Sequence, residues 1–164
     1  MVKLYKNFNI KNNHKNSLIL IGNFDGVHLG HQKLFKLAKL YKKKYKIKIG
    51  VVNFDPMPKM FFNKLHKNFR ITSINQKIEL LGKLKVDFII TKKFDKKFSK
   101  TKSLNFIKEI LNKKLKSKFI FVSNNFRFGN KREGNVTLLF ENEKKFNFKV
   151  VNPGPLIKQK KIIS

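Results

Sequence analysis

The sequence predicts an α/β fold, with a mostly parallel sheet of five to six strands and helices on both faces. Two features of its 164 residues lead to this prediction. Short apolar runs, typical of strands buried on both faces, alternate with longer segments of helical periodicity along almost the whole chain. The connections are short, so each helix becomes a right-handed crossover between parallel strands. We therefore expect one Rossmann-like, doubly wound domain.

Strands are expected where the continuous apolar runs lie. The first run ends at Gly22, and the second is stopped by Asp55-Pro56-Met57-Pro58, because proline cannot donate to a ladder. The five expected strands are Leu18–Ile21, 47–54, 86–91, 119–122 and 146–151.

Helices are expected where apolar residues recur three and four positions apart. Ser73 should cap one of them, with Gln76 completing a capping box. The expected helices are 31–45, the segment that begins at Ser73, 104–115 and a short one over 136–140, with a loop over 124–135.

Composition excludes several classes of protein. The chain has no cysteine, which excludes disulfides, zinc ribbons, iron–sulfur clusters and cysteine nucleophiles. No apolar stretch approaches the roughly 18 to 20 residues that span a bilayer. The N-terminal segment lacks the apolar core of a secretory signal. We expect a cytoplasmic protein without a membrane partner.

The net charge of +30 raises the question of nucleic-acid binding, because cations release counterions from phosphates. Of the 39 basic residues only Arg70, Arg127 and Arg132 are arginine, whereas nucleic-acid sites depend on arginine for bidentate contacts. Lys, Asn, Ile and Phe are encoded by A/T-rich codons, so codon drift is the favoured explanation. The charge should still attract small anionic substrates, with binding that weakens in salt.

The glycine-rich segment 22–32 carries the chemistry. It forms the turn between the first buried strand and the first long helix, where unpaired N–H groups favour phosphate. Gly26 and Gly30 allow a tight turn and close approach of a ligand. His28 and His31 are three residues apart, so both rings can reach one phosphate and stabilise its growing charge.

Other interpretations of these histidines stay open. The pair could be purely structural, or could bind zinc, although no third neighbouring ligand is evident. His14 and His66 are expected to be packing or surface residues. A Walker phosphate loop is excluded, because its G-x-x-x-x-G-K-[ST] pattern does not occur.

Several segments resemble one family. His28-Leu29-Gly30-His31 is similar to the H-x-G-H signature of nucleotidyltransferases, and the longer string GNFDGVHLGHQ resembles the adenylyltransferase module of bacterial FAD synthetases, the bifunctional riboflavin kinase/FMN adenylyltransferases. The other similar segments are Phe54-Asp55-Pro56-Met57-Pro58 (F-x-P-x-P), 71–81 (L-T-x-x-x-x-K-x-x-L-L), 94–98 with 106–107 (F-x-x-x-F and E-F-I), and 122–134, VSNNFRFGNKREG (V-G-x-D-F-R-F-G-x-x-R-x-G).

The resemblance implies transfer of AMP from ATP to FMN, giving FAD and pyrophosphate, with Mg²⁺ on the triphosphate. It implies that His28 and His31 are catalytic. The implied ATP-binding residues are Gly22, Asn23, Phe24, Asp25, Gly30, Asn125, Arg127 and Ser164. The implied flavin-binding residues are Phe54, Pro56, Pro58 and Phe126. Arg127 could instead form a structural salt bridge, and Phe54 could simply end a core strand.

The sequence departs from the family pattern in two ways. Ser123 stands where the family has Gly, and Asn125 where it has Asp, which affects ligand affinity. The family motif I-S-S-T-x-I-R is represented only by Ile163-Ser164, and no riboflavin kinase barrel follows. We therefore expect residues 1–164 to be an adenylyltransferase domain cut short at its C-terminal end. The alternatives are another phosphate acceptor, or an inactive remnant that binds nucleotide or RNA.

Overall fold

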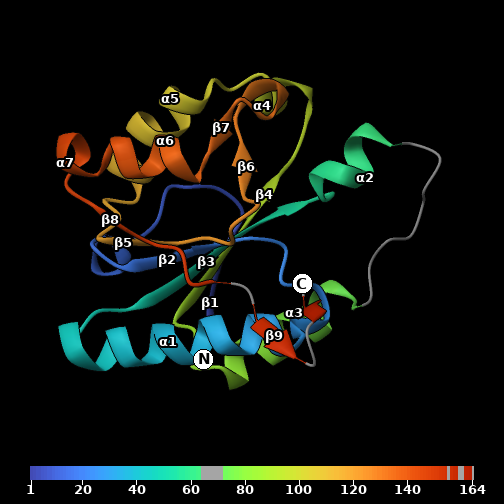
Figure 1. The fold of residues 1–164 in the computed structure, drawn as a ribbon, viewed down its shortest axis with the longest axis vertical. Coiled ribbons are helices and arrows are strands. Elements are labelled where there is room, and N and C mark those ends of the chain that lie inside the picture. Colours follow the sequence, from blue (N-terminus) through green and yellow to red (C-terminus); the bar gives the residue numbers. More distant parts are fainter. Residues whose placement is uncertain (64–71, 155, 159–160, 164) are drawn as a thin grey trace.

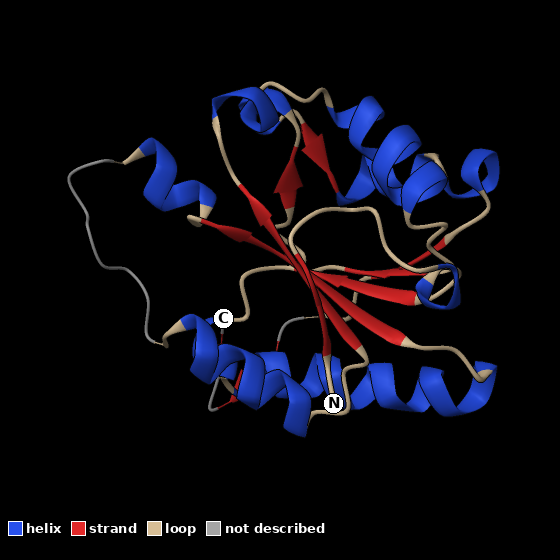
Figure 2. Ribbon diagram, turned by 180° about the vertical axis from the view of Figure 1, so that it is seen from behind, coloured by secondary structure: helices blue, strands red, loops and turns tan. Residues whose placement is uncertain are grey.

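A computed structural model describes residues 1–63, 72–154, 156–158 and 161–163, and shows a six-stranded sheet between two layers of helices (Figures 1 and 2). The strand order is β1-β4-β3-β2-β5-β8, and every pair in this sheet is parallel. The predicted fold class is confirmed. Within the described residues no helix is long and apolar enough to cross a membrane.

The elements have the following bounds. The sheet strands are β1 (Lys3–Tyr5), β2 (Leu18–Ile21), β3 (Ile49–Asp55), β4 (Phe88–Lys93), β5 (Phe119–Phe121) and β8 (Lys149–Val151). Two small antiparallel pairs are β6 (Arg127–Phe128) with β7 (Gly134–Asn135), and β9 (Leu156–Lys158) with β10 (Lys161–Ile163). The α-helices are α1 (Leu29–Tyr45), α2 (Pro58–Phe62), α3 (Ile74–Lys83), α4 (Lys96–Ser99), α5 (Ser103–Asn105), α6 (Val136–Glu141) and α7 (Glu143–Phe146). The remaining turns are η1 (Asn12–His14), η2 (Asp25–Val27) and η4 (Asn130–Arg132), and a π-helix, η3 (Phe106–Lys114), continues α5.

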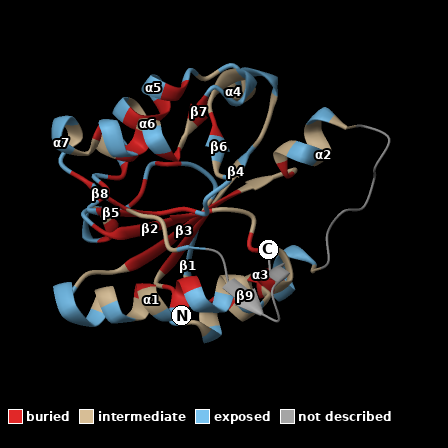
Figure 3. Cartoon of the chain, viewed as in Figure 1, coloured by how far each residue is buried: buried red, intermediate tan, exposed pale blue. Residues whose placement is uncertain are grey.

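Each face of the sheet builds its own core. In β2, Leu18 and Leu20 face α1 and α3, whereas Ile19 and Ile21 face η3 and α6. All four side chains are at most 3% exposed, which explains why this strand is a continuous apolar run rather than an alternating one (Figure 3).

The topology predicts a ligand-binding crevice at the end of β2. From β2 the chain moves outward on one side to β3 and β4, and later returns to β5 on the other side. The loops after β2 and β5 therefore leave the sheet at the point where the strand order reverses, and ligands of such sheets bind at this point. Loop 22–28 and loop 122–126 are the segments that lie there.

Most predicted elements are confirmed, with small shifts at their ends. Ser73 caps α3 through the predicted capping box with Gln76. The loop expected over 124–135 contains the short β6–β7 hairpin, and the strand expected over 146–151 begins only at Lys149 because α7 occupies 143–146. The edge strand β1 and the short helices α2 and α4 were not predicted, since a segment of three to five residues has too few positions to show a period.

Two polar side chains, buried His14 and partly buried Asp87, organise the beginning of β4. His14 is 7% exposed, stacks on Phe88 with a ring-centroid distance of 4.6 Å, and its Nδ1 lies 2.7 Å from the Tyr5 hydroxyl. This confirms the expectation that His14 is a packing residue. Phe88 also requires Gly50, because a Cβ there would lie 2.2 Å from the Phe88 ring.

Asp87 anchors the beginning of β3 to the end of α1. Its carboxylate accepts hydrogen bonds from the Ile49 N–H (2.8 Å) and from Lys42 Nζ (2.7 Å). Ile49 is fully buried, whereas the Lys42 and Asp87 side chains are about a third and a quarter exposed. The bond to the backbone should therefore contribute more to stability than the ion pair.

We predict that Asp87→Ala lowers the free energy of unfolding by about 1–3 kcal/mol, because it leaves a buried N–H without an acceptor. Lys42→Met should lower it by less than about 1 kcal/mol, because it removes only a partly exposed ion pair. Urea denaturation of both variants measures the difference. Equal losses in the two variants would show that the ion pair, and not the backbone contact, is the anchor.

Candidate active site

The loop between β2 and α1 folds through three left-handed residues. Phe24, Gly26 and Val27 have φ angles of 49°, 69° and 42°. Left-handed backbone costs a non-glycine residue about 1–2 kcal/mol, so Phe24 and Val27 are held there by their burial in the core. Strain of this kind concentrates at functional sites.

This loop brings His28 and His31 face to face. His28 is the N-cap of α1, and its carbonyl accepts from the Gln32 N–H, so the helix begins directly at the motif. The two imidazole rings stack with centroids 3.6 Å apart and an interplanar angle of 26°. The Phe24 ring packs edge-on against His31 at 5.1 Å. The structure therefore brings the two rings together, as their spacing in the sequence predicts.

Both rings hold a buried nitrogen that is not satisfied by the protein. Nδ1 of His28 and Nδ1 of His31 are buried, and neither has a hydrogen-bond partner within the described part of the chain. A buried polar atom without a partner costs about 1–3 kcal/mol, so each of these nitrogens is a candidate contact for a water or a ligand.

His31 is neutral at physiological pH. Its pKa is lowered to about 4, first by burial and then by the nearby His28 and Lys77, while Asp25 opposes the shift. A neutral imidazole has one donor nitrogen and one acceptor nitrogen. His31 alone thus offers a phosphate one hydrogen bond, unless the anion itself raises the pKa.

Asp25 connects the histidine loop to α3. Its Oδ1 accepts hydrogen bonds from the Thr72 backbone N–H (2.9 Å) and from the Thr72 hydroxyl (2.8 Å). The same hydroxyl lies 3.4 Å from the Gly26 N–H. In this structure Asp25 therefore holds the loop in place.

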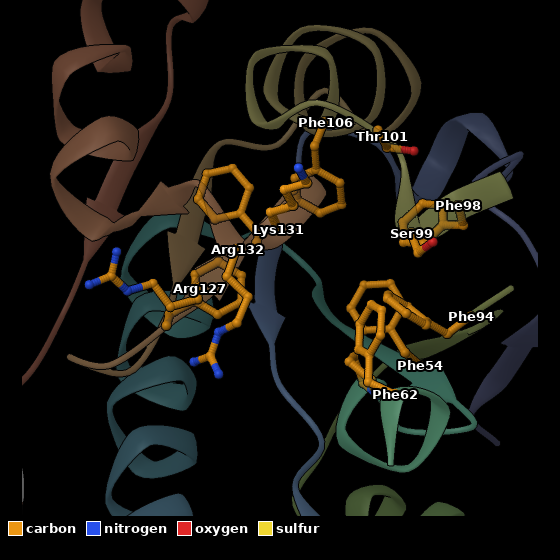
Figure 4. Close-up of a pocket in the computed structure, with 14 residues that line it drawn as sticks. Phe54, Phe62, Phe94, Phe98, Ser99, Thr101, Phe106, Arg127, Lys131 and Arg132 are labelled. Carbon is orange, nitrogen blue, oxygen red and sulfur yellow. The ribbon is translucent and has the colours of Figure 1, made fainter. Parts of the chain in front are cut away.

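An aromatic cavity opens near the ends of β3 and β4 (Figure 4). The cavity volume is about 100 Å³, within a wider empty space of about 630 Å³ that is partly open to solvent. Of the predicted flavin residues, Phe54, Pro58 and Phe126 line it, whereas Pro56 lies in the preceding turn after the cis Asp55–Pro56 bond. Its remaining lining residues are Phe62, Phe94, Phe98, Ser99, Thr101, Phe106, Arg127, Phe128, Gly129, Lys131 and Arg132.

Sequence reasoning missed much of this cavity. Three of these phenylalanines come from α2, α4 and η3, and Phe94 lies in the loop after β4, so only the fold brings Phe62, Phe94, Phe98 and Phe106 together. The sequence left open whether Phe54 lines a cavity or simply ends a core strand. It is both, because it packs on the core while lining the cavity. The F-x-x-x-F spacing of Phe94 and Phe98 was the available signal.

The predicted ATP residues surround the end of β2 and the loop after β5. Gly22 N–H donates to Val52 O, and a Cβ on Gly22 would lie 3.1 Å from the Phe24 ring. Asn23 and Gly30 lie on either side of the turn and are partly exposed. Ser164 lies outside the described residues.

The two residues that depart from the family pattern, Ser123 and Asn125, contact each other. The Ser123 hydroxyl donates to Asn125 Oδ1 at 2.9 Å, on the exposed loop after β5. Arg127 follows on β6 and is exposed, and within the described residues its guanidinium pairs with no carboxylate. The structural salt bridge considered for Arg127 is therefore not found there.

Metal binding by side chains alone has no assembled site in the part of the chain that the structure describes. No group of three His, Cys, Asp or Glu residues comes together there. The zinc interpretation of the histidine pair consequently lacks a third ligand among those residues.

The parallel fold, the reversal of strand order beside β2 and the histidine pair at a helix N-terminus are typical of α/β domains of the nucleotidyltransferase type. Sequence comparison gives the family. Residues 10–164 match FAD synthetase, and the chain belongs to the FAD synthetase family.

Curated relatives agree. The chain is 45% identical over 156 residues to the bifunctional riboflavin kinase/FMN adenylyltransferase of Buchnera aphidicola subsp. Schizaphis graminum, covering 94% of this chain and 49% of the relative. It is 33% identical over 135 residues to the enzyme of that name in Escherichia coli K12, covering 82% of this chain and 43% of the relative. The chain thus spans about half the length of the curated relatives it matches.

Solved structures share the fold. One described as a macrolide-efflux protein from Streptococcus pneumoniae aligns with a TM-score of 0.84 at 24% identity, covering 99% of this chain and 53% of that one. A pantoate-beta-alanine ligase from Francisella tularensis, complexed with Beta-gamma ATP and beta-alanine, aligns with a TM-score of 0.60 at 14% identity, covering 97% and 69%. At these identities the likeness is one of fold.

We predict that His31 makes stability depend on pH. As pH falls below 6.5, the unfolded chain takes up a proton that folded His31 does not accept until about pH 4, so stability is lost across this window. The loss should be about 2 kcal/mol after discounting for partial solvent exposure. Urea unfolding at pH 7.5 and 4.5 should therefore show a smaller pH effect in His31→Gln than in the native chain. The pKa of His14 is also lowered, chiefly by burial, so some pH dependence should remain. Equal pH effects in the two proteins would contradict the assignment.

Proposed function

We propose that this chain is an FMN adenylyltransferase, which transfers AMP from ATP to FMN to give FAD and pyrophosphate. The observation that carries the proposal is the stacked His28–His31 pair, with both Nδ1 atoms buried and unsatisfied, at the switch point of the sheet. Membership of the FAD synthetase family supports it independently.

The reaction needs no protein nucleophile. An ionised oxygen of the FMN phosphate attacks the α-phosphorus of ATP, and a new P–O bond forms. The bond from the α-phosphorus to the bridging oxygen breaks, and pyrophosphate leaves with the electron pair. Catalysis then consists of positioning two anions and stabilising the charge that develops at the α-phosphoryl oxygens.

His28 and His31 are proposed to provide that stabilisation. Both lie in the first turn of α1 or at its N-cap, where free backbone N–H groups and the helix dipole also favour anions. The phosphate is proposed to contact the accessible parts of the two partly exposed rings, because both Nδ1 atoms are buried. Binding an anion should also raise the pKa of His31 from its low value, which would strengthen the contact as charge grows.

The ATP is proposed to lie along the turn after β2 and across to the loop after β5. Gly22, Asn23, Phe24, Asp25 and Gly30 would form one side of this site, and Asn125 and Arg127 the other, with Ser164 completing the phosphate contacts. Asp25 would act by holding the loop through Thr72. The strand order supports this arrangement, because β2 and β5 are direct neighbours.

The flavin ring is proposed to occupy the aromatic cavity. Phe54, Pro58 and Phe126 line it, and Pro56 shapes the turn that carries Pro58. Phe126 is stacked on Phe128 with centroids 5.3 Å apart, which provides a flat apolar wall. Flavin rings are flat, largely apolar ligands, and an apolar pocket with a few polar anchors suits them.

Mg²⁺ is proposed to arrive with ATP as part of the substrate. Phosphate oxygens and waters supply most ligands of such an ion, so a preformed side-chain cage is not required. When bound, Mg²⁺ neutralises part of the triphosphate charge.

The direct test is to incubate the chain with FMN and Mg-ATP, and to separate the flavins by chromatography while measuring pyrophosphate. FAD and pyrophosphate formed in equal amounts are expected. FAD absent while both substrates bind would support the alternative of a nucleotide-binding remnant. Product formation only with another phosphate acceptor would support a different nucleotidyltransferase.

We predict that His28→Ala lowers turnover by about 10²-fold or more, because a contact to the developing charge is lost. The dissociation constant of ATP should rise by less than about threefold, the pattern of a group that acts mainly in the transition state. Steady-state kinetics and equilibrium ATP binding give the two numbers, and circular dichroism confirms folding. Turnover equal to that of the native chain would remove His28 from this role.

A further inference from the structure

Three cations stand on one rim of the aromatic cavity. Arg127, Lys131 and Arg132 all line it, and all three are exposed (Figure 4). Figure 4 shows Arg127 and Arg132 on one side of the opening, with Phe54, Phe62 and Phe94 on the other. The cavity therefore has an apolar side and a positively charged side.

The segment that carries these cations is fixed to the protein. Glu133 Oε1 accepts hydrogen bonds from the Ser103 N–H (2.8 Å) and hydroxyl (3.2 Å), at the beginning of α5. The Asn130 N–H donates to Thr101 O at 2.7 Å. Gly129 has a φ of 78°, and a Cβ there would lie 2.7 Å from the Ser103 nitrogen, so the turn also packs closely against α5.

The backbone at the rim is strained. Lys131 and Arg132 have φ angles of 51° and 57°, two successive side chains in the left-handed region that favours glycine. Such strain is retained where the surroundings impose it, and it is concentrated at ligand sites. Here the Glu133 and Asn130 contacts impose it, and the two cationic side chains are thereby placed in the cavity wall.

The charge of the rim is not neutralised by the protein. Within the described residues none of the three cations forms a salt bridge, and Glu133, their neighbour in sequence, is engaged with Ser103. Random surface charge does not explain the composition either. The chain has three arginines among 39 basic residues, and two of the three lie within six residues on this rim. Arginine is the residue that binds phosphate through two parallel hydrogen bonds.

We propose that Lys131 and Arg132 bind the phosphate of the flavin substrate, so that this rim selects phosphorylated flavin over the unphosphorylated ring system. The proposal rests on the flavin site proposed above. The aromatic wall contributes affinity for the ring, which FMN and riboflavin share. The cationic rim contributes affinity only for the phosphate, so FMN should bind more tightly than a flavin that has no group to adenylylate.

The test compares FMN and riboflavin binding by quenching of flavin fluorescence, at low salt and with about 200 mM added salt. The proteins are the native chain, Lys131→Gln, Arg132→Gln and the double variant, with Lys36→Gln, an exposed lysine in the middle of α1, as the matched charge control. Binding of ATP is measured in parallel.

Each rim substitution should weaken FMN binding by roughly three- to tenfold and leave riboflavin binding unchanged, since exposed charge-assisted contacts are of modest strength. Salt should weaken FMN binding in the native chain more than in the double variant. Lys36→Gln should leave the ratio of the two flavin affinities as it is in the native chain.

Four results would overturn the proposal. Equal loss of both flavins would assign the rim to folding or to the ring. An unchanged FMN-to-riboflavin ratio with weaker ATP binding would assign the cations to the nucleotide. A native chain that binds both flavins equally would remove the selection while leaving the adenylyltransferase proposal intact, whereas a native chain that binds neither would reject the flavin site itself.

Discussion

The pairing of β2 with a parallel strand on each side is the constraint on which the rest of the structure depends. β2 pairs with β3 on one edge and with β5 on the other, and all four of its side chains are buried. At the carboxyl end of β2 the chain must leave the sheet, because side chains already fill the core on each face. It turns sharply there, and the turn is where the histidines lie. Because β2 has a paired strand on each edge and a hydrophobic core on each face, a site at its end is positioned more accurately than a site on a free loop.

The loop after β2 has several features that lower local stability. The loop carries Phe24 and Val27 in left-handed conformations, and two imidazole nitrogens are buried without partners. Each of these features costs about 1–3 kcal/mol, and the burial of Phe24, Val27 and Phe35 in the core below offsets them. Asp25 adds an anchor to α3 through Thr72. Unsatisfied nitrogens and strained backbone in the same turn support the function proposed for this site.

The fold was predictable from the sequence because its signals are local and repeated. The continuous apolar run Leu18–Ile21 marks a doubly buried strand, and Ser73 with Gln76 marks a helix start, and both were found as expected. The histidine pair was also predictable, since the distance between residues i and i+3 at a helix start is set by helix geometry. The aromatic cavity was only partly predictable, because Phe62, Phe98 and Phe106 approach one another through tertiary packing that no periodicity encodes. The short hairpin over 127–135 was missed for the same reason: its strands are two residues long and depend on contacts with α5.

The net charge of +30 can be divided into a general part and a specific part. Lysines spread over the surface create a diffuse positive field, which raises the encounter rate with any anion and is screened by salt. A diffuse field cannot distinguish FMN from ATP or from an unrelated phosphate. Discrimination requires charges at fixed distances from a shaped apolar wall, as where Lys131 and Arg132 face the phenylalanines of the cavity. The two arginines retained at this rim are thus better explained by local geometry than by overall charge, because for the diffuse field a lysine would serve equally well.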